Sequence, residues 1–389
     1  MERRFTVGCW ILLCAGTWTA AGAPRGTATF TPLPDLDGGS LNCSASAVSA
    51  DGSTIVGFGT NAQRTEAVRW RNDIPEPLGV LPGRTTSNAI ELSGDGAIIV
   101  GSSGPFPSSL AFRWEAGLMT EVPILPGSTS NSANAISRDG RVISGWSYNT
   151  AGFTAFRYEN ASLSVLSDIP GGVAEDSAVS AAINFDGSII AGRGRSPGFF
   201  YEACRWVAPS TAAIPMGDLA GGAAHSEIDA MNADGSVMVG YANSAQQSGG
   251  LWGEAARWVN NGPAQSLGDL PGGSFNGYAF GVSDNGNTIV GYSNTSLGNE
   301  AFIWNPESGI RNLRLVLEAD FGLDLSGWLL TIATDVSADG RTIVGVGTNP
   351  AGQPQAWVVR FAPPFCPGDA NGDGAVDFAD IVSVLANWS

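Results

Sequence analysis

Short apolar runs alternate with clusters of Gly, Asn, Asp and Ser along the chain from about residue 27 to residue 361. Where the pattern opens, residues 45–49, 54–58, 66–71 and 77–81 each read as a short strand, and Asp51-Gly52 separates the first two. Because Asp-Gly between two such runs is a strong hairpin signal, we expect a type I′ turn there, with positive φ at both central residues. No run of ten or more residues shows helical periodicity in this region, so the pattern predicts an all-β fold.

This strand pattern recurs seven times. An Asp-Gly or Asn-Gly pair returns every 44 to 54 residues, and each is followed by an apolar run that ends in Gly, such as Ile55-Val56-Gly57. An aromatic residue comes next, and a Leu-Pro-Gly-like element separates the units, although the seventh separator is blurred within residues 313–327. The pairs begin at Asp51, Asp95, Asp139, Asp186, Asp234, Asn285 and Asp339, and the aromatic residues are Trp70, Trp114, Tyr158, Trp206, Trp258, Trp304 and Trp357. Such repetition predicts one structural unit used seven times.

Seven four-stranded units match the blades of a β-propeller. A single small sheet cannot bury both of its faces, whereas neighbouring blades in a closed ring cover one another, and the recurring aromatic residue fills the space between them. The last unit ends on its third strand, and residues 27–36 read as a fourth strand. Either this N-terminal strand closes the last blade, or each blade is cut before its fourth strand. The alternative fold is a linear β-solenoid, and we expect the seven-bladed propeller.

The repeats resemble a known family. The segments Glu66-Ala67-Val68-Arg69-Trp70 and Leu110-Ala111-Phe112-Arg113-Trp114, with the Leu-Gly-Asp-Leu-Pro-Gly-Gly element at residues 267–273, are similar to the HAF repeat of bacterial extracellular proteins. The resemblance covers about residues 30–361. It implies an extracellular repeat protein without an established reaction. The family's name-giving His is replaced here by Glu, Leu, Thr or Gln, so no role of that residue carries over.

Residues that recur from unit to unit are expected to be structural, because one active site needs one constellation rather than seven. The Asp-Gly pairs are turn formers, and the arginines that precede the aromatic residue pair with a nearby carboxylate or carbonyl. These arginines are Arg69, Arg113, Arg157, Arg205 and Arg257. The single histidine, His225, is expected in a loop. No paired carboxylates stand in a distinctive motif, and a glycosidase pair at the channel mouth stays open.

The loops opposite the Asp-Gly turns are candidates for a binding face. They vary in length and are rich in Ser, Asn, Gly and aromatic residues, and variation on one face of a repeat protein often marks a binding surface. The candidate ligand contacts are Phe106, Tyr148, Phe153, Phe200, Tyr201 and Trp252. Ordinary loop packing is an equally open interpretation for each of them.

Composition narrows the function. Lysine is absent and the basic residues are 19 arginines, so a P-loop lysine, a Schiff-base lysine and a lysine general base are excluded. The formal net charge is −17, which argues against a nucleic-acid partner because such binding needs clustered positive charge.

The N-terminus has the order of a secretory signal: Arg3 and Arg4, an apolar stretch over residues 5–19, and small residues up to Ala23. We predict a signal peptide over residues 1–23 and no transmembrane span, so that the chain is secreted to the extracellular space or cell surface. Cys43, Cys204 and Cys366 would remain, an odd number, so at least one is free or forms an intermolecular disulfide. Cys204 lies in a predicted buried strand and is expected to be an inert core thiol.

The C-terminal tail is a different module. The predicted propeller spans residues 24–361, and a linker and tail occupy residues 362–389. The loop over residues 369–380 places oxygen ligands at positions 1, 3, 5, 9 and 12, with Gly374 at position 6 and a backbone carbonyl at position 7. The ligands would be Asp369, Asn371, Asp373, Ala375, Asp377 and Asp380, and the predicted ion is Ca²⁺.

An apolar stripe follows this loop. Ile381, Val384, Leu385 and Trp388 have helical spacing. The loop and stripe resemble one repeat of a type I dockerin. Dockerins normally carry two repeats, which leaves cohesin binding open. Similar short tails preceded by a Cys, here Cys366, occur on exported planctomycete proteins and imply anchoring or sorting.

These patterns lead to an expected function. The chain reads as a secreted, non-enzymatic propeller that binds a glycan or a protein on one face and is anchored through its calcium-binding tail to a cohesin-like or surface receptor. Two alternatives stay open: a carbohydrate-active enzyme or glycan-binding subunit of a polysaccharide-degrading system, and a structural exoprotein.

Overall fold

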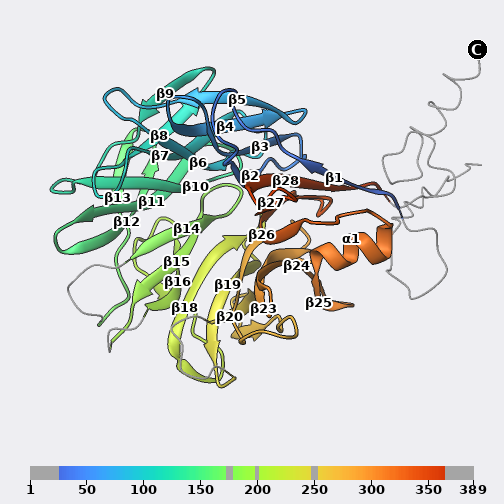
Figure 1. Ribbon diagram of the computed structural model, residues 1–389. Coiled ribbons are helices and arrows are strands. Elements are labelled where there is room, and N and C mark those ends of the chain that lie inside the picture. The colour runs from blue at the N-terminus through green and yellow to red at the C-terminus, as the bar shows by residue number, and fades with distance from the viewer. Residues whose placement is uncertain (1–25, 172–177, 198–200, 247–252, 364–389) are drawn as a thin grey trace, which may run out of the picture.

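The protein is a seven-bladed β-propeller (Figure 1). The computed structural model describes residues 26–171, 178–197, 201–246 and 253–363. These residues form seven four-stranded antiparallel sheets and one helix. The propeller prediction is therefore confirmed, and the solenoid alternative is wrong. The predicted signal peptide and the calcium-binding loop lie outside the described residues. None of the helices in the described part of the chain has the length and hydropathy of a membrane span.

Each blade runs from its innermost strand, at the centre of the ring, to its outermost strand. The first blade consists of β2 (Ser44–Val48), β3 (Thr54–Thr60), β4 (Thr65–Arg71) and β5 (Ile74–Gly79). The second consists of β6 (Ser87–Leu92), β7 (Ile98–Ser103), β8 (Leu110–Glu115) and β9 (Leu118–Glu121). The third consists of β10 (Ser130–Ile136), β11 (Val142–Asn149), β12 (Gly152–Glu159) and β13 (Ser162–Val165).

The next three blades follow the same order. The fourth consists of β14 (Val179–Ile183), β15 (Ile189–Arg195), β16 (Tyr201–Val207) and β17 (Ile214–Pro215). The fifth consists of β18 (Gly221–Met231), β19 (Val237–Ser244), β20 (Glu254–Val259) and β21 (Ala264–Ser266). The sixth consists of β22 (Gly277–Val282), β23 (Ile289–Thr295), β24 (Gly298–Asn305) and β25 (Gly309–Asn312).

The seventh blade is built from both ends of the chain. Its inner strands are β26 (Leu329–Val336), β27 (Thr342–Thr348) and β28 (Pro354–Phe361), and its outermost strand is β1 (Ala28–Pro32). β1 pairs antiparallel with β28, with Ala28 opposite Phe361 and Pro32 opposite Trp357 (Figure 1). Of the two closure modes left open by the sequence, the N-terminal strand closing the last blade is the one observed.

The recurring aromatic residue fills the space between blades. Trp70, Trp206 and Trp258 are each 1% exposed, and each buried aromatic side chain removes roughly 150–250 Å² from water. The indole N–H of Trp70 donates to the Pro34 carbonyl at 2.8 Å, and that of Trp206 donates to the Ser167 carbonyl at 2.8 Å. Each of these two indoles thus packs its blade and holds the segment that leads into it.

The Asp-Gly turns differ from the expected type I′ form. Gly52 has a φ of 74°, whereas Asp51 is not among the described non-Gly residues with positive φ. Ser49 Oγ donates to Asp51 Oδ1 at 2.6 Å and accepts from Thr54 N–H at 2.9 Å, and Asp51 Oδ1 accepts from Ser53 N–H at 3.0 Å. The type I′ prediction is therefore wrong, because the Ser and Asp side chains stabilise a longer loop that needs positive φ only at Gly.

The two-residue hairpins with positive φ at both positions lie elsewhere, between the third and fourth strands. Asn72 and Asp73 have φ values of 50° and 63°, and Asn160 and Ala161 have φ values of 50° and 61°. Both pairs connect directly opposed strand residues, as expected for type I′ turns.

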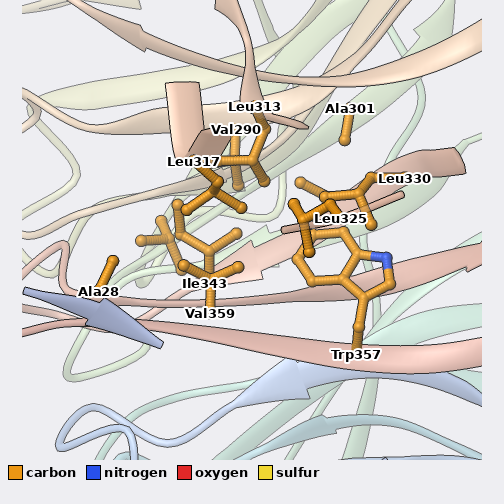
Figure 2. Close-up of a cluster of buried hydrophobic side chains, with 12 residues drawn as sticks. Ala28, Val290, Ala301, Leu313, Leu317, Leu325, Leu330, Ile343, Trp357 and Val359 are labelled. Carbon is orange, nitrogen blue, oxygen red and sulfur yellow. The ribbon is translucent and has the colours of Figure 1, made fainter. Parts of the chain in front are cut away.

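A short helix precedes the seventh blade. α1 (Leu313–Phe321) lies in the stretch where the repeat was blurred. Asn312 caps its start by accepting from Leu315 N–H at 3.1 Å, and Gly322, with a φ of 69°, ends it. Its Leu313 and Leu317 side chains pack into the cluster around Trp357 (Figure 2). The strand pattern did not indicate this helix, which at nine residues is shorter than the periodicity we searched for.

Candidate functional site: the central channel

The innermost strands of all seven blades enclose a cavity of about 530 Å³. Each of these strands carries a β-bulge, where one extra residue interrupts the pairing with the second strand. The bulged residues all line the cavity, and they are Ser46, Ile90, Asn134, Ala181, Asp229, Phe280 and Thr334. Each stands five residues before the Asp or Asn of its turn, and no two are alike. The side chain that the repeat presents to the channel thus differs in every blade.

The recurring Gly of the second strand makes room for these bulges. A Cβ added to Gly57 would overlap the Ser44 carbonyl oxygen, and one added to Gly101 would overlap that of Asn88. The inner strand therefore approaches the second strand more closely than any side chain allows. This close approach explains why each apolar run ends in Gly.

The channel is bridged at the end that carries the Asp-Gly turns. Ala50 N–H donates to the Gly94 carbonyl at 3.0 Å, and Gly94 N–H donates to the Arg138 carbonyl at 2.9 Å. Similar bonds continue around the ring and return to Ala50 from Ala338, with one link made by the Asn232 side chain to the Asp284 carbonyl. The linked positions at the centre of the turns are Ala50, Gly94, Arg138, Phe185, Ala233, Asp284 and Ala338.

An ion pair crosses this end of the ring. Arg138 belongs to the third blade and Asp284 to the sixth, and Arg138 Nη1 lies 2.6 Å from Asp284 Oδ1 and 2.7 Å from Oδ2. Two blades separate them on one side and three on the other, so the pair spans the channel. A partly exposed pair of this kind adds at most about 1 kcal/mol to stability, and its main effect is to narrow this end.

Two carboxyls interact on the wall formed by the seventh, first and second blades. Glu91 and Asp335 both follow the bulge, a position that holds Ala or Gly in the other five blades. Asp335 accepts from Val48 N–H at 2.9 Å and from Val336 N–H at 2.7 Å, and Glu91 accepts from Leu92 N–H at 2.8 Å.

The electrostatics of these two acids follow from burial. Loss of hydration, reinforced by the charge of Asp335, raises the pKa of Glu91 to about 8. Burial also raises the pKa of Asp335 to about 7, against the opposing effect of its two backbone hydrogen bonds. Arg138 favours the ionised form of both groups, but more weakly than burial opposes it. Near neutral pH the pair therefore holds at least one proton.

The opposite wall is aromatic and carries a single carboxyl. Asp229, the bulged residue of the fifth blade, has a buried Oδ2 with no hydrogen-bond partner in the part of the chain that the structure describes. Beside it the sixth blade presents Phe280 and Tyr278, whose rings stack with centroids 5.6 Å apart, and Tyr292 stacks on Tyr278 at 5.5 Å. Burial raises the pKa of Asp229 well above its usual value, and the neighbouring Glu227 adds to this effect.

An ion pair joins the fourth and fifth blades next to this wall. Arg193 Nη1 lies 2.5 Å from Glu227 Oε2, and the Arg193 guanidinium sits 4.5 Å from the centre of the Tyr201 ring. His225 Nδ1 lies 3.0 Å from Tyr241 Oη. The expectation of a loop histidine is wrong, because His225 is part of β18.

Three of the expected ligand contacts come together in one aromatic cluster. Phe106 from the second blade lies against Tyr148 and Phe153 of the third, with ring centroids 4.9 Å and 6.2 Å away. Trp146, which the sequence analysis did not single out, completes the group at 5.1 Å from Phe153. Tyr201 belongs instead to the neighbourhood of Arg193 and His225. Phe200 and Trp252 lie outside the described residues.

The recurring arginines mostly behave as expected. Arg69 pairs with Glu76 at 2.6 Å, Arg157 pairs with Glu159 at 2.8 Å, and Arg113 pairs with Glu115. Arg257 Nε donates to Gln265 Oε1 at 3.1 Å, and its guanidinium stacks on Trp304 of the next blade. The exception is Arg205, whose buried Nε has no partner in the described chain.

The cysteines of the propeller are unpaired and buried. Cys204 is fully buried in β16, which confirms the predicted core thiol, and burial raises its pKa well above the usual value. Burial likewise raises the pKa of the Cys43 thiol to about 11. Cys366 lies outside the described residues.

The predicted calcium ligands and docking stripe also lie outside the described residues. These are Asp369, Asn371, Asp373, Ala375, Asp377, Asp380, Ile381, Val384, Leu385 and Trp388. Across residues 26–363, leaving out the undescribed gaps, no group of three or more His, Cys, Asp or Glu side chains is placed to hold a metal ion.

The sequence analysis missed Glu91, Asp229, Phe280 and Asp335. A signal for them was present, because an alignment of the seven copies on their turns places all four at two neighbouring positions. Most copies have small residues there, and only these four positions carry an acid or an aromatic ring. Residues that recur in the copies build the shared backbone of the repeat, whereas a single site in a ring of repeats lies where the copies differ.

Comparisons with known proteins support the fold. The sequence matches no protein-family model and no curated protein. Among solved structures, oligogalacturonate lyase from Vibrio parahaemolyticus is similar with a TM-score of 0.53 and 10% identity, over 88% of this chain and 99% of the lyase. A puromycin-hydrolysing peptidase from Mycobacterium tuberculosis gives 0.52 and 14%, over 87% of this chain and 55% of the peptidase.

TolB from Acinetobacter baumannii is a further similar structure, with a TM-score of 0.47 and 13% identity over 67% of this chain and 63% of TolB. The chain thus spans less than two thirds of the length of both the peptidase and TolB. At such low identities the likeness shows a shared propeller fold alone. It leaves the function to the chemistry of the channel.

Proposed function

We propose that this protein is an exported binding protein whose propeller takes a ligand at the end of the channel opposite the Asp-Gly turns. The observation that carries the proposal is the contrast between the two ends. Arg138 and Asp284 bridge the turn end, whereas the bulged side chains vary along the channel and an aromatic cluster lies on the other face. A ligand therefore has access from the loop side.

Glycan binding tests this face. Binding of the full mature chain to immobilised polysaccharides is compared for wild type, a Phe106→Ala/Tyr148→Ala/Phe153→Ala variant and Phe185→Ala. Phe185 is a matched control, because it is 54% exposed on the turn side and Phe106 is 55% exposed on the loop side. We expect the triple variant to lose affinity by about tenfold or more, since aromatic residues dominate such contacts, and the control to bind normally.

Unchanged binding by the triple variant would show that this aromatic cluster does not contact the ligand. Polysaccharides and whole cells that fail to retain the wild-type chain would favour a structural exoprotein instead. A protein ligand is tested with the same variants on whole cells treated with protease, which removes a protein receptor and leaves glycans in place.

The tail is proposed to bind calcium and to anchor the protein. Asp369, Asp373 and Asp377 stand at ligand positions of the predicted loop, and the stripe from Ile381 to Trp388 would dock to a cohesin-like or other surface receptor. Calorimetry of the full chain should show one weak site, with a dissociation constant on the order of 10⁻⁴–10⁻³ M. A chain that ends at residue 363 is the control, and equal calcium binding by both chains would contradict the assignment.

An enzyme is the second candidate, and the observation that favours it is the half-buried pair Glu91 and Asp335. A carboxyl that keeps its proton near neutral pH is suited to general-acid catalysis, and a second carboxyl beside it could act as base or nucleophile. Release of reducing ends from oligosaccharides would reveal such an activity. We expect Glu91→Gln and Asp335→Asn to abolish it, and a rate that survives both changes would place the chemistry elsewhere.

A further inference from the structure

The charged side chains that line the channel do not balance. Glu91, Asp229 and Asp335 contribute three carboxyls, and Arg138 is the guanidinium among the lining residues. Arg138 is already paired with Asp284 at the turn end. Arg193, next to the aromatic wall, is already paired with Glu227. The cavity therefore has a surplus of acidic groups without a matching cation from the described protein.

Asp229 shows this imbalance most clearly. Its Oδ2 is buried and accepts no hydrogen bond from any described residue, although a buried carboxylate oxygen ordinarily has a partner. Arg193 acts on it electrostatically, but Glu227, which holds Arg193, opposes that effect. The carboxyl of Asp229 thus lies at the cavity wall with an unfilled requirement for a donor or a positive charge.

Aromatic rings stand next to this carboxyl. Phe280 occupies the same bulged position one blade further on and lines the cavity, and Tyr278 and Tyr292 stack beside it. Burial raises the pKa of both tyrosines, and the charge of Asp229 adds to this effect. The face of an aromatic ring attracts cations, and alkylated ammonium groups in particular bind where rings and a carboxylate converge.

We propose that the channel binds an organic cation, a ligand with a quaternary or alkylated ammonium group held between Asp229 and the rings of Phe280 and Tyr278. This inference rests on the proposed function, because it assumes that the ligand enters the channel, and it adds the chemical class. The cavity of about 530 Å³ has the size of small-molecule sites, which range over roughly 300–1,000 Å³. The bridged turn end directs entry from the loop side.

Binding should strengthen as pH rises. A quaternary ammonium group does not titrate, so any pH dependence comes from the protein. The channel acids are protonated in part near neutral pH because their pKa values are raised, to about 8 for Glu91 and about 7 for Asp335. A bound cation favours their ionised forms, and binding therefore releases protons. The other charged groups that act on them are Arg138, Glu227 and Arg193.

Calorimetry with choline as the probe tests the proposal. Its neutral isostere, 3,3-dimethylbutan-1-ol, has the same shape without the charge, and EDTA keeps calcium from the tail. We expect choline to bind at least about tenfold more tightly than the isostere, and to bind more tightly at about pH 8.5 than at about pH 6. Titrations in buffers of different ionisation enthalpy should show proton release.

Three variants locate the site. Asp229→Asn should weaken choline binding by about tenfold or more, because it removes the charge and keeps the shape. Phe280→Leu should weaken it by roughly threefold to tenfold and leave the isostere unaffected, since it removes the ring face and keeps an apolar side chain. Asp37→Asn removes an exposed carboxyl outside the channel and should change nothing. Thermal melts confirm that each variant is folded.

Equal binding of choline and its isostere, or full binding by Asp229→Asn, would overturn the proposal. If choline does not bind while the Phe106→Ala/Tyr148→Ala/Phe153→Ala variant still loses a glycan ligand, the organic cation is the wrong ligand class. The proposed binding face is then supported. If choline binds in the channel and no glycan or cell surface is recognised, the channel site is supported. The proposed role of the aromatic cluster is then contradicted.

Discussion

At the scale of single residues, this protein concentrates its unusual chemistry at two positions of the repeat. The bulged residue lines the channel in every blade, its successor does so in five of them, and most copies place a small or neutral side chain at both positions. Glu91, Asp229 and Asp335 are the exceptions. A carboxyl that loses hydration in a half-buried site costs free energy when it ionises, so these residues weaken the fold at high pH.

The stability of the protein should therefore fall as pH rises. The folded pKa of Glu91, about 8, lies above its ordinary value of 4.5, so the folded state binds more protons than the unfolded state between these values. The free energy of unfolding then decreases with pH across this window, and the loss is complete above the folded pKa. Asp335 acts in the same direction between 3.8 and about 7.

Glu91→Gln isolates this effect. We expect Glu91→Gln to raise the melting temperature at about pH 8.5. We also expect it to reduce the difference in the free energy of unfolding between pH 5 and pH 8.5 by an amount on the order of 1–2 kcal/mol. Glu307→Gln, which changes an exposed glutamate, is the matched control. A wild-type melting temperature that rises between pH 5 and pH 8.5, together with an unchanged profile in Glu91→Gln, would show that the pair does not govern this dependence.

At the scale of elements, the blade is a four-stranded sheet in which the two innermost strands approach unusually closely. The bulge in the first strand and the Gly in the second belong to one device, because the extra residue brings a carbonyl oxygen to where a Cβ would stand. The Ser-x-Asp-Gly loop completes the hairpin through side-chain hydrogen bonds, such as Ser93 Oγ to Asp95 Oδ1 at 2.6 Å. Sequence repetition here reflects backbone geometry rather than chemistry.

Gly101→Ala tests the element. The added methyl would meet the Asn88 carbonyl oxygen and the Phe112 ring, so the strands must separate or the bulge must be lost. We expect a loss of about 3 kcal/mol or more in the free energy of unfolding, measured by chemical denaturation. Ser102→Ala, at the next residue of the same strand, should cost less than about 1 kcal/mol. Similar costs for both changes would show that the strands can move apart freely.

At the scale of the whole molecule, the ring is closed by its own two ends. β1 comes from the start of the described chain and pairs with β28, so it supplies the outermost of the four strands of the seventh blade. Phe30 of β1 packs edge-on against Trp328, with ring centroids 5.0 Å apart, and also contacts Trp357. Closure therefore depends on strand pairing and on aromatic packing together.

Removal of β1 should destabilise the ring as a whole. A chain that begins at residue 33 leaves β28 as an exposed edge, which favours aggregation and lowers the unfolding temperature. We expect a decrease on the order of 10 °C by calorimetry, and partial recovery on addition of a peptide with residues 26–34. A melting temperature unchanged by the deletion would show that three strands suffice for the seventh blade.

The architecture could be predicted from the sequence because it depends on short strands and turns that are encoded locally and repeated seven times. The strands of the first blade were expected within a few residues of their observed bounds, and the aromatic residues of the third strands were expected to be buried. The turn type was assigned to the wrong hairpin, because Asp-Gly was read without the Ser two residues before it. α1 was missed because a nine-residue helix leaves too short a pattern.

The sequence by itself determined the seven four-stranded blades and the aromatic residues that fill the space between them. A pattern of burial that repeats from blade to blade requires a sequence pattern with the same period. Only the tertiary structure decided which side chains meet in the channel. Glu91 and Asp335 are 244 residues apart along the chain, and Arg138 and Asp284 are 146 apart. These residues come together because closure of the ring brings every inner strand to one axis. No local sequence pattern indicates which residues of distant blades will then be neighbours.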